Sequence, residues 1–190
     1  IDKTRRNLVV ATCAAGGVAS AGAAVPFVAS MWPSERARAG GAPVEADISR
    51  LQPGELGVYE WRGKPVCVLR RTKEMLASLK NMADKIADPD SEEQLQPEYA
   101  KNDTRSIKPE YAVLVGICSH LGCSPTAKPE PKGDMGPDWA GGFYCPCHGS
   151  KFDLAGRVFK GAPAPINLEV PPHAYLSDTT LLIGEDKKGA

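Results

Sequence analysis

Two short cysteine–histidine boxes constrain this chain more than any other feature of its sequence. Box one reads C-S-H-L-G-C over residues 118–123, and box two reads C-P-C-H-G-S over residues 145–150. Each box offers one cysteine and one histidine at a spacing that suits a metal, and each leaves one further cysteine over. Two loops that each donate one thiolate and one imidazole can form a single shared site.

The paired residues are the candidate metal ligands: Cys118, His120, Cys145 and His148. A [2Fe–2S] cluster needs two protein ligands for each iron, and this set supplies two thiolates and two imidazoles. Neutral imidazoles in place of thiolates make the cluster less negative, so its reduction potential rises. An imidazole ligand at the surface can also exchange its remaining ring proton as the iron changes charge. The pattern therefore favours a carrier that couples electron transfer to proton transfer.

A structural zinc site is the alternative for the same ligands, because tetrahedral zinc accepts two cysteines and two histidines. Zinc fingers, however, pair cysteine with cysteine and histidine with histidine, whereas each box here mixes the two. Zinc also gives no role to the leftover Cys123 and Cys147, which could join the two loops. An all-disulfide scaffold leaves the matched histidines unexplained, so the iron–sulfur interpretation is favoured.

The N-terminal part of the chain has the length and composition of a membrane anchor. From Leu8 to Trp32 no residue carries a charge, and a membrane-spanning helix needs about 20 such residues. Before this run, T-R-R-N-L-V at residues 4–9 is typical of a twin-arginine export signal. A cleaved signal peptide is the alternative, but the uncharged run exceeds a usual signal core. We expect residues 1–33 to be a retained anchor with its basic N-terminus in the cytoplasm.

The rest of the chain divides into a neck and a head. Residues 34–46 contain Gly40, Gly41 and a proline without apolar periodicity, which predicts a flexible hinge. Residues 47–190 alternate short β-prone runs with Gly, Pro and Asp, which predicts a mainly β head domain. The candidate strands are residues 56–61, 65–70, 111–117, 142–145, 167–170 and 181–184.

One helix is expected inside the head, over residues 73–87. Met75, Leu79, Met82 and Ile86 recur at helical spacing and form its apolar face. Thr72 can cap the start of the helix, and the Asp-Pro pair after it marks the end. The polar, proline-punctuated residues 89–109 that follow are predicted to be a surface loop.

Charge excludes one class of function. The chain has 23 Lys and Arg residues against 23 Asp and Glu residues. A nucleic-acid-binding protein would carry a basic excess, so no nucleic acid is expected as a partner.

The paired boxes, the export signal, the neck and the β-rich head resemble the bacterial Rieske iron–sulfur proteins of the cytochrome bc complex, the quinol–cytochrome c reductase. The resemblance covers the whole chain. It implies a Rieske antiparallel β-sandwich head with one helix–loop insertion, anchored by an N-terminal transmembrane helix. It also implies one Rieske [2Fe–2S] cluster, with Cys118 and Cys145 on the inner iron and His120 and His148 on the outer iron.

The same resemblance implies further roles for residues around the cluster. Cys123 and Cys147 should form a disulfide between the two loops, and Ser150 should donate a hydrogen bond to a bridging sulfide. Leu121 should be the apolar tip that docks into the quinol pocket. The proline-rich residues 161–165 should cover the cluster from a third side.

Two residues stand apart from this pattern. Phe152 occupies a position where relatives often have a tyrosine that donates a hydrogen bond to a ligand sulfur. A phenylalanine cannot donate, so we expect a lower potential than in tyrosine-bearing relatives. His173, the third histidine, follows two prolines and is expected to be a surface residue rather than a ligand.

The function implied by the resemblance is proton-coupled electron transfer. His148, together with His120, would accept a hydrogen bond and then a proton from ubiquinol or menaquinol. The cluster would take one electron, and the head would pass that electron to a c-type cytochrome. The expected partners are cytochrome b and cytochrome c subunits of a dimeric complex in the bacterial inner membrane, with the head on the periplasmic side. No catalysis is expected from the chain alone. The alternative is the Rieske subunit of another exported redox enzyme, such as arsenite oxidase.

Overall fold

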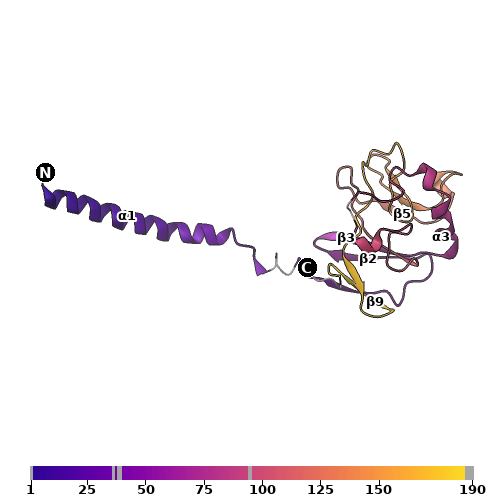
Figure 1. Ribbon diagram of the computed structural model, residues 1–190, viewed down its shortest axis with the longest axis horizontal. Helices are drawn as coiled ribbons and strands as arrows, with labels where there is room; N and C mark the ends of the chain where they lie inside the picture. Colours follow the sequence, from indigo (N-terminus) through magenta and orange to yellow (C-terminus); the bar gives the residue numbers. More distant parts are fainter. Residues whose placement is uncertain (1, 36, 38–39, 94–95, 187–190) are drawn as a thin grey trace. The chain divides into compact units, whose positions relative to one another are not determined.

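The computed structural model describes residues 2–35, 37, 40–93 and 96–186. The chain divides into two compact units, residues 1–40 and residues 41–190. Figure 1 labels the elements of both units.

The first unit contains the long helix α1 (Lys3–Ser30), which includes Pro26 and buries none of its residues. Its N-terminus is capped by Asp2, whose carboxylate accepts from the backbone N–H of Thr4 at 2.9 Å. Among the described helices, α1 alone is long and apolar enough to cross a membrane. The anchor predicted from the uncharged run is therefore helical, and the missing buried face suits an environment of lipid or of other membrane helices.

In the second unit, the head, the described residues form three antiparallel sheets of three strands each. The first sheet is β1 (Val44–Asp47), β9 (Thr180–Ile183) and β8 (His173–Tyr175); the second is β2 (Leu56–Trp61), β3 (Lys64–Arg70) and β4 (Tyr111–Val115); the third is β5 (Thr126–Lys128), β6 (Gly142–Tyr144) and β7 (Lys151–Phe152). The mainly β fold class is thus confirmed.

The sheet of β2, β3 and β4 separates two hydrophobic cores. Side chains alternate between the two faces of a strand, so Val66 and Val68 of β3 enter the core shared with β9, whereas Leu69 enters the other core. That other core also contains Phe143 and Phe152 of the third sheet. All five residues of β4 are buried, as expected for a strand covered on both faces.

The helix is shorter than its sequence pattern predicts. Helix α3 runs over Lys73–Lys80, capped by Thr72, and a 3-10 turn, η1 (Ala83–Lys85), follows it. Ile86 then forms a β-bridge with Phe159, which holds the chain extended where the pattern would continue the helix. Leu79, Met82 and Ile86 are nevertheless buried. The prediction that these residues face the core is therefore confirmed, although the helix ends before Met82.

Three other expectations about the head are wrong or need adjustment. Residues 167–170, expected to be a strand, form no ladder; the carbonyl of Glu169 accepts a single hydrogen bond, from Val115 N–H at 2.8 Å. The predicted hinge, residues 34–46, overlaps β1, because pairing with β9 begins at Val44. Residues 36, 38 and 39 of that hinge lie outside the described residues.

The third correction concerns residues 89–109, which are not a plain surface loop. They include the short helix η2 (Glu98–Ala100), and Arg105 is fully buried. Its guanidinium donates to the carbonyls of Ala155 at 3.0 Å and Leu168 at 2.8 Å. These contacts tie the segment to the part of the head that follows β7.

His173 is also not a surface residue. It begins β8 and is only 1% exposed. Its Nδ1 lies 2.8 Å from the carbonyl oxygen of Pro171, and its backbone N–H donates to the hydroxyl of Tyr99 at 2.8 Å. The two preceding prolines suggested a turn, but the pairing of β8 with β9 takes the side chain into the interior.

Candidate metal centre

The two boxes form loops with the same backbone closure. In box one, between β4 and β5, the N–H of Cys118 donates to the carbonyl of Cys123 at 2.7 Å, and the N–H of Gly122 donates to the carbonyl of Cys118 at 3.0 Å. In box two, between β6 and β7, the N–H of Cys145 donates to the carbonyl of Ser150 at 2.8 Å, and the N–H of Gly149 donates to the carbonyl of Cys145 at 2.9 Å. The first cysteine of each loop is thus fixed by its own loop.

A glycine makes this closure possible in both loops. Gly122 has a φ of 81° and Gly149 a φ of 79°, values that residues with a Cβ rarely adopt. Each glycine is the fifth residue of its box, where the chain turns back toward the first cysteine. The repeated glycine is a signal in the sequence that both boxes share one loop geometry.

The loops bring the four candidate ligands together. The rings of His120 and His148 lie 4.7 Å apart between centroids, edge to face. The thiols of Cys118 and Cys145 are hydrogen-bonded to each other, and each cysteine is 2% exposed. His120 is half-buried and His148 is exposed. The site therefore has a buried sulfur end and an outer imidazole end.

The atoms at this site fit an iron–sulfur cluster. Cys118 and Cys145 are free of disulfides and buried. Nδ1 of His120 is buried and has no hydrogen-bond partner among the described residues, an arrangement that costs free energy unless another group binds the nitrogen. Two soft thiolates beside two imidazoles are the donor set that a Rieske cluster requires.

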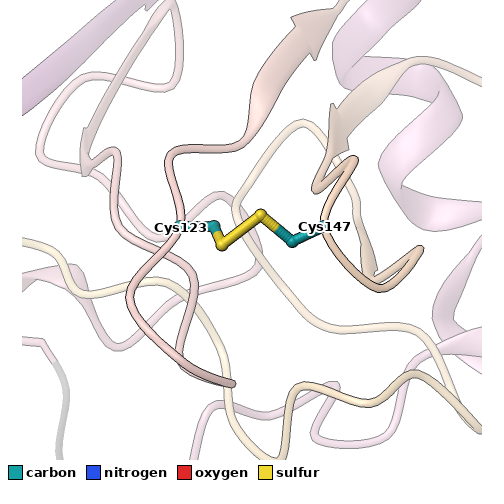
Figure 2. Close-up of a disulfide and its surroundings, with 2 residues drawn as sticks. All are labelled: Cys123 and Cys147. Carbon is teal, nitrogen blue, oxygen red and sulfur yellow. A yellow bond between two sulfur atoms is a disulfide. The ribbon is translucent and has the colours of Figure 1, made fainter.

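The two leftover cysteines form a disulfide between the loops, as the resemblance implied. Cys123 and Cys147 are bonded through their sulfur atoms, with their Cα atoms 6.7 Å apart, and Figure 2 shows the bond bridging two separate loops. The sulfur of Cys145 lies within 4.8 Å of both bonded sulfurs. Because the disulfide occupies two of these three sulfurs, Cys145 alone among them has a thiolate to offer a metal.

A third segment is hydrogen-bonded to both boxes. The hydroxyl of Ser119 in box one donates to the carbonyl of Ile166 at 2.6 Å. The hydroxyl oxygen of Ser150 in box two accepts from the N–H of Ala164 at 3.0 Å. The expected third wall, residues 161–165, thus lies against box two, and the next residue holds box one. Ser119 was not singled out from the sequence, although its place inside box one could have marked it.

Ser150 has the geometry of a donor toward the sulfur end. The residue is fully buried, and its oxygen accepts from Ala164 while its O–H donates to the Cys118 thiol. Burial, with a further contribution from Cys145, raises the pKa of that thiol above its ordinary value, while hydrogen bonds from the His120 backbone and from Ser150 act in the opposite direction. These donors stabilise a thiolate at Cys118, which is the form that binds metal.

Two further sequence expectations concern exposure. Leu121, between His120 and the end of box one, is 71% exposed and presents an apolar tip beside the imidazole end. Phe152 in β7 is fully buried, in the core that also contains Cys118 and Cys145. A side chain at position 152 therefore lies in the same cluster of buried groups as the two thiols.

Comparison with known proteins matches both units. Residues 93–172 match the family described as "Rieske [2Fe-2S] domain", and residues 2–34 match "Ubiquitinol-cytochrome C reductase Fe-S subunit TAT signal". The ubiquinol-cytochrome c reductase iron-sulfur subunit of Allochromatium vinosum is 63% identical over 100% of this chain and 93% of its own length. The subunit of the same name from Bradyrhizobium diazoefficiens is 41% identical over 95% of this chain and 94% of its own length.

A solved structure is also similar. A chain of the structure titled "Hyperthermophilic respiratory Complex III" is 30% identical, covers 91% of this chain and 98% of its own length, and gives a TM-score of 0.48.

The fold, the two boxes and the disulfide define a Rieske [2Fe–2S] protein with a membrane anchor. Within that class, the chain belongs to the family of ubiquinol–cytochrome c reductase iron–sulfur subunits.

Proposed function

We propose that the head takes one electron and one proton from a quinol and passes the electron to a c-type cytochrome. Cys118 and Cys145 would hold the inner iron of the cluster, and His120 and His148 the outer iron. The observation that supports this most is the pairing of two buried, free thiols with two outer imidazoles. One imidazole, that of His120, has a buried Nδ1 without a hydrogen-bond partner in the described part of the chain.

The residues of the chain divide the work between a buried end and an exposed end. When bound, the cluster would supply a one-electron acceptor whose potential is raised by its two imidazole ligands. Ser150 would donate a hydrogen bond at the buried end, favouring the more negative form. The exposed His148 would accept the hydrogen bond of the quinol and then hold its proton, with the less exposed His120 as its neighbour.

Leu121 supports docking at a quinol site of a cytochrome b partner. Leu121 is 71% exposed beside the imidazole end. Its entry into an apolar pocket would remove this apolar surface from water, which favours docking. The quinol would be ubiquinol or menaquinol. Leu121→Asn should raise the KM for quinol in the assembled complex while leaving the spectrum of the cluster unchanged.

Transfer to a c-type cytochrome is proposed to need movement of the head on the neck. The support is the composition of residues 34–46, with Gly40 and Gly41 just before β1. Stiffening residues 36–44 with prolines should slow turnover of the complex. Unimpaired steady-state activity in such a variant would contradict the proposal.

The proposed assembly is a dimeric complex in the bacterial inner membrane, with a single-pass anchor and a periplasmic head. The excess of Lys3, Arg5 and Arg6 over Asp2 supports a cytoplasmic N-terminus. Protease added to spheroplasts should remove the head and leave α1 in the membrane. Co-purification with cytochrome b and c subunits, rather than with a molybdenum subunit, would separate this assembly from an arsenite-oxidase-type partner.

The deciding experiment is electron paramagnetic resonance of the full chain, reduced first with ascorbate and then with dithionite. We expect a rhombic signal with an average g value below that of the free electron, already after ascorbate. A signal that requires dithionite would keep the mixed ligands but contradict quinol oxidation. Stoichiometric zinc without an iron signal would overturn the whole assignment.

A further inference from the structure

Three arginines hold one buried turn close to box two in the chain. The turn spans residues 153–156 and follows β7, the strand that begins directly after box two. The N–H of Gly156 closes the turn by donating to the carbonyl of Asp153 at 3.0 Å. The guanidinium groups bind three successive residues of the turn: Arg157 the carboxylate of Asp153 at 2.7 Å, Arg71 the carbonyl of Leu154 at 3.2 Å, and Arg105 the carbonyl of Ala155 at 3.0 Å.

The charges around this turn do not balance. The three arginines are each between 0% and 4% exposed. Asp153, 1% exposed, is the one buried carboxylate among the described residues. Asp88, which also interacts with Arg105, is only half-buried. The interior of the head therefore holds an excess of positive charge, which is unusual because a buried charge is costly without a counter-charge.

The arginines keep their charge in spite of this cost. Burial lowers the pKa of Arg71 and of Arg105, each to about 10, while the carboxylate of Asp153 acts in the opposite direction. Both guanidinium groups are therefore positive at neutral pH. The backbone carbonyls that accept from them are dipoles, so these carbonyls stabilise the charge without cancelling it.

The turn lies in the same hydrophobic core as the metal centre. Leu154 and Ala155 pack in the buried cluster that contains Cys118 and Cys145. Asp153 is three residues after Ser150, so the length of the chain keeps their Cα atoms within about 11 Å. No layer of solvent separates residues of one buried core, which leaves the charges weakly screened there.

Arg105 also reaches toward box one. Its guanidinium donates to the carbonyl of Leu168 at 2.8 Å. Two residues before Leu168, the carbonyl of Ile166 accepts from the hydroxyl of Ser119 at 2.6 Å. The length of the chain and these two hydrogen bonds keep the guanidinium within about 20 Å of box one. Both boxes are thus within range of a buried positive charge.

We propose that the excess positive charge of Arg71, Arg105 and Arg157 raises the reduction potential of the Rieske cluster, in addition to its imidazole ligands. Reduction adds one negative charge to the cluster, and a buried positive charge favours that change. The three arginines are therefore tuning residues of the electron carrier. The inference concerns the cluster itself and does not depend on which molecule supplies the electron.

The test measures the midpoint potential of the full chain with its cluster, in detergent, by protein-film voltammetry. Arg105→Gln removes one buried positive charge, whereas Arg105→Lys keeps the charge but loses the forked guanidinium. Arg105→Gln should weaken the hold of the cluster on its electron about threefold to tenfold, which is about 30–60 mV. Arg105→Lys should stay close to the unaltered protein. Equal losses in both variants would mean that geometry rather than charge matters, and would overturn the proposal.

A second variant predicts a shift of the opposite sign. Asp153→Asn removes the buried negative charge, so the midpoint potential should rise. The amide oxygen of the asparagine can still accept from the N–H groups of Ala155 and Arg157, as the carboxylate does at 2.9 Å and 2.8 Å. A loosened turn would not raise the potential, so an unchanged or lowered value in Asp153→Asn would overturn the proposal even if Arg105→Gln loses its cluster.

Arg50→Gln is the matched control, because Arg50 is an exposed arginine whose charge is screened by water and salt. Its potential should equal that of the unaltered protein. Visible circular dichroism and the Tm of each variant show whether the cluster and the fold are intact. An equal shift in Arg50→Gln and Arg105→Gln would show that only the total charge of the protein counts, and the buried arginines would have no special role.

Discussion

The head holds two histidine nitrogens that are buried without a hydrogen-bond partner among the described residues, in two different settings. Nδ1 of His120 lies at the metal centre, next to two free thiols and a disulfide. Nε2 of His173 is buried at β8, next to the rings of Tyr99 and Tyr175, two residues that line a cleft there. Two ring nitrogens of the same kind, each without a partner among the described residues, therefore lie in two different chemical environments.

The neighbours of each nitrogen define that environment. Thiolates are soft anionic ligands, so an imidazole beside them completes a site for iron. Around His173 the neighbours are instead the rings of Tyr99 and Tyr175, which pack edge-on against the imidazole. The two regions also differ in how they are held: a covalent bridge joins the metal loops, whereas packing and hydrogen bonds hold the cleft.

Removing the covalent bridge should have the largest effect and should act on the metal centre. We expect Cys123→Ser combined with Cys147→Ser to lower the free energy of unfolding by about 2–5 kcal/mol and to release the cluster, since the loops lose the disulfide that joins them. Visible circular dichroism of the cluster and a thermal melt would measure both.

The matched control for the disulfide is Cys13→Ser, because Cys13 is an exposed cysteine of α1. It should leave the melt and the cluster spectrum of the head unchanged. A double variant that keeps its cluster and its Tm would show that backbone closure alone holds the two boxes together.

Arg105 connects the two regions and gives the next largest effect. It lies in the segment that forms one wall of the cleft and donates to the carbonyls of Ala155 and Leu168 behind β7. Burial lowers its pKa to about 10, so it stays charged at neutral pH. Arg105→Met leaves both carbonyls without a donor and should cost about 2 kcal/mol.

The measurement for Arg105→Met is a melt followed both by far-ultraviolet circular dichroism and by cluster absorbance. Both transitions should move to lower temperature together, because the arginine links the regions. Arg50→Met, at an exposed position, is the control. A shift of only one of the two signals would mean that the regions unfold independently.

The metal centre could be predicted from the sequence far more fully than the cleft. Its proposed ligands are local: two six-residue boxes carry the thiols, the imidazoles and the glycines that close each loop. The disulfide partners followed from the family resemblance. Strands 56–61 and 142–145 were also placed within a residue, since their patterns depend on local alternation.

The cleft depends on contacts between residues far apart in the chain, and the sequence does not encode these locally. His173 followed two prolines and suggested a surface turn, yet pairing of β8 with β9 buries it. Arg105 stood in a polar segment, and only the carbonyls of Ala155 and Leu168 explain its burial. The predicted end of the helix, at residue 87, is wrong for the same reason: Ile86 pairs with the distant Phe159 in a β-bridge instead of continuing the helix.

Phe152 tests the electronic side of the metal centre with a smaller change. It is buried in the same core as Cys118 and Cys145, where a tyrosine hydroxyl could donate to a ligand sulfur. Phe152→Tyr should raise the midpoint potential by roughly 40 mV, which corresponds to about 1 kcal/mol for one electron. Protein-film voltammetry would measure the change.

Phe159→Tyr is the control for the potential, because Phe159 stacks on Trp139 rather than joining the core of the two thiols. Its potential should match that of the unaltered protein. An unchanged potential in Phe152→Tyr would count against any hydrogen bond to sulfur from position 152.

The smallest expected effect concerns the pH dependence of stability from His173. Burial lowers its pKa below the ordinary value of 6.5, so below about pH 6.5 the unfolded chain binds a proton that the native chain refuses. The free energy of unfolding should therefore fall with decreasing pH, by at most about 1.4 kcal/mol per pH unit from this group. His173→Asn removes the titration, so its urea midpoint should fall less than that of the unaltered protein between pH 7.5 and pH 5. Since both proteins keep His120 and His148, the difference isolates the cleft histidine, and parallel profiles would mean that His173 is protonated inside the fold.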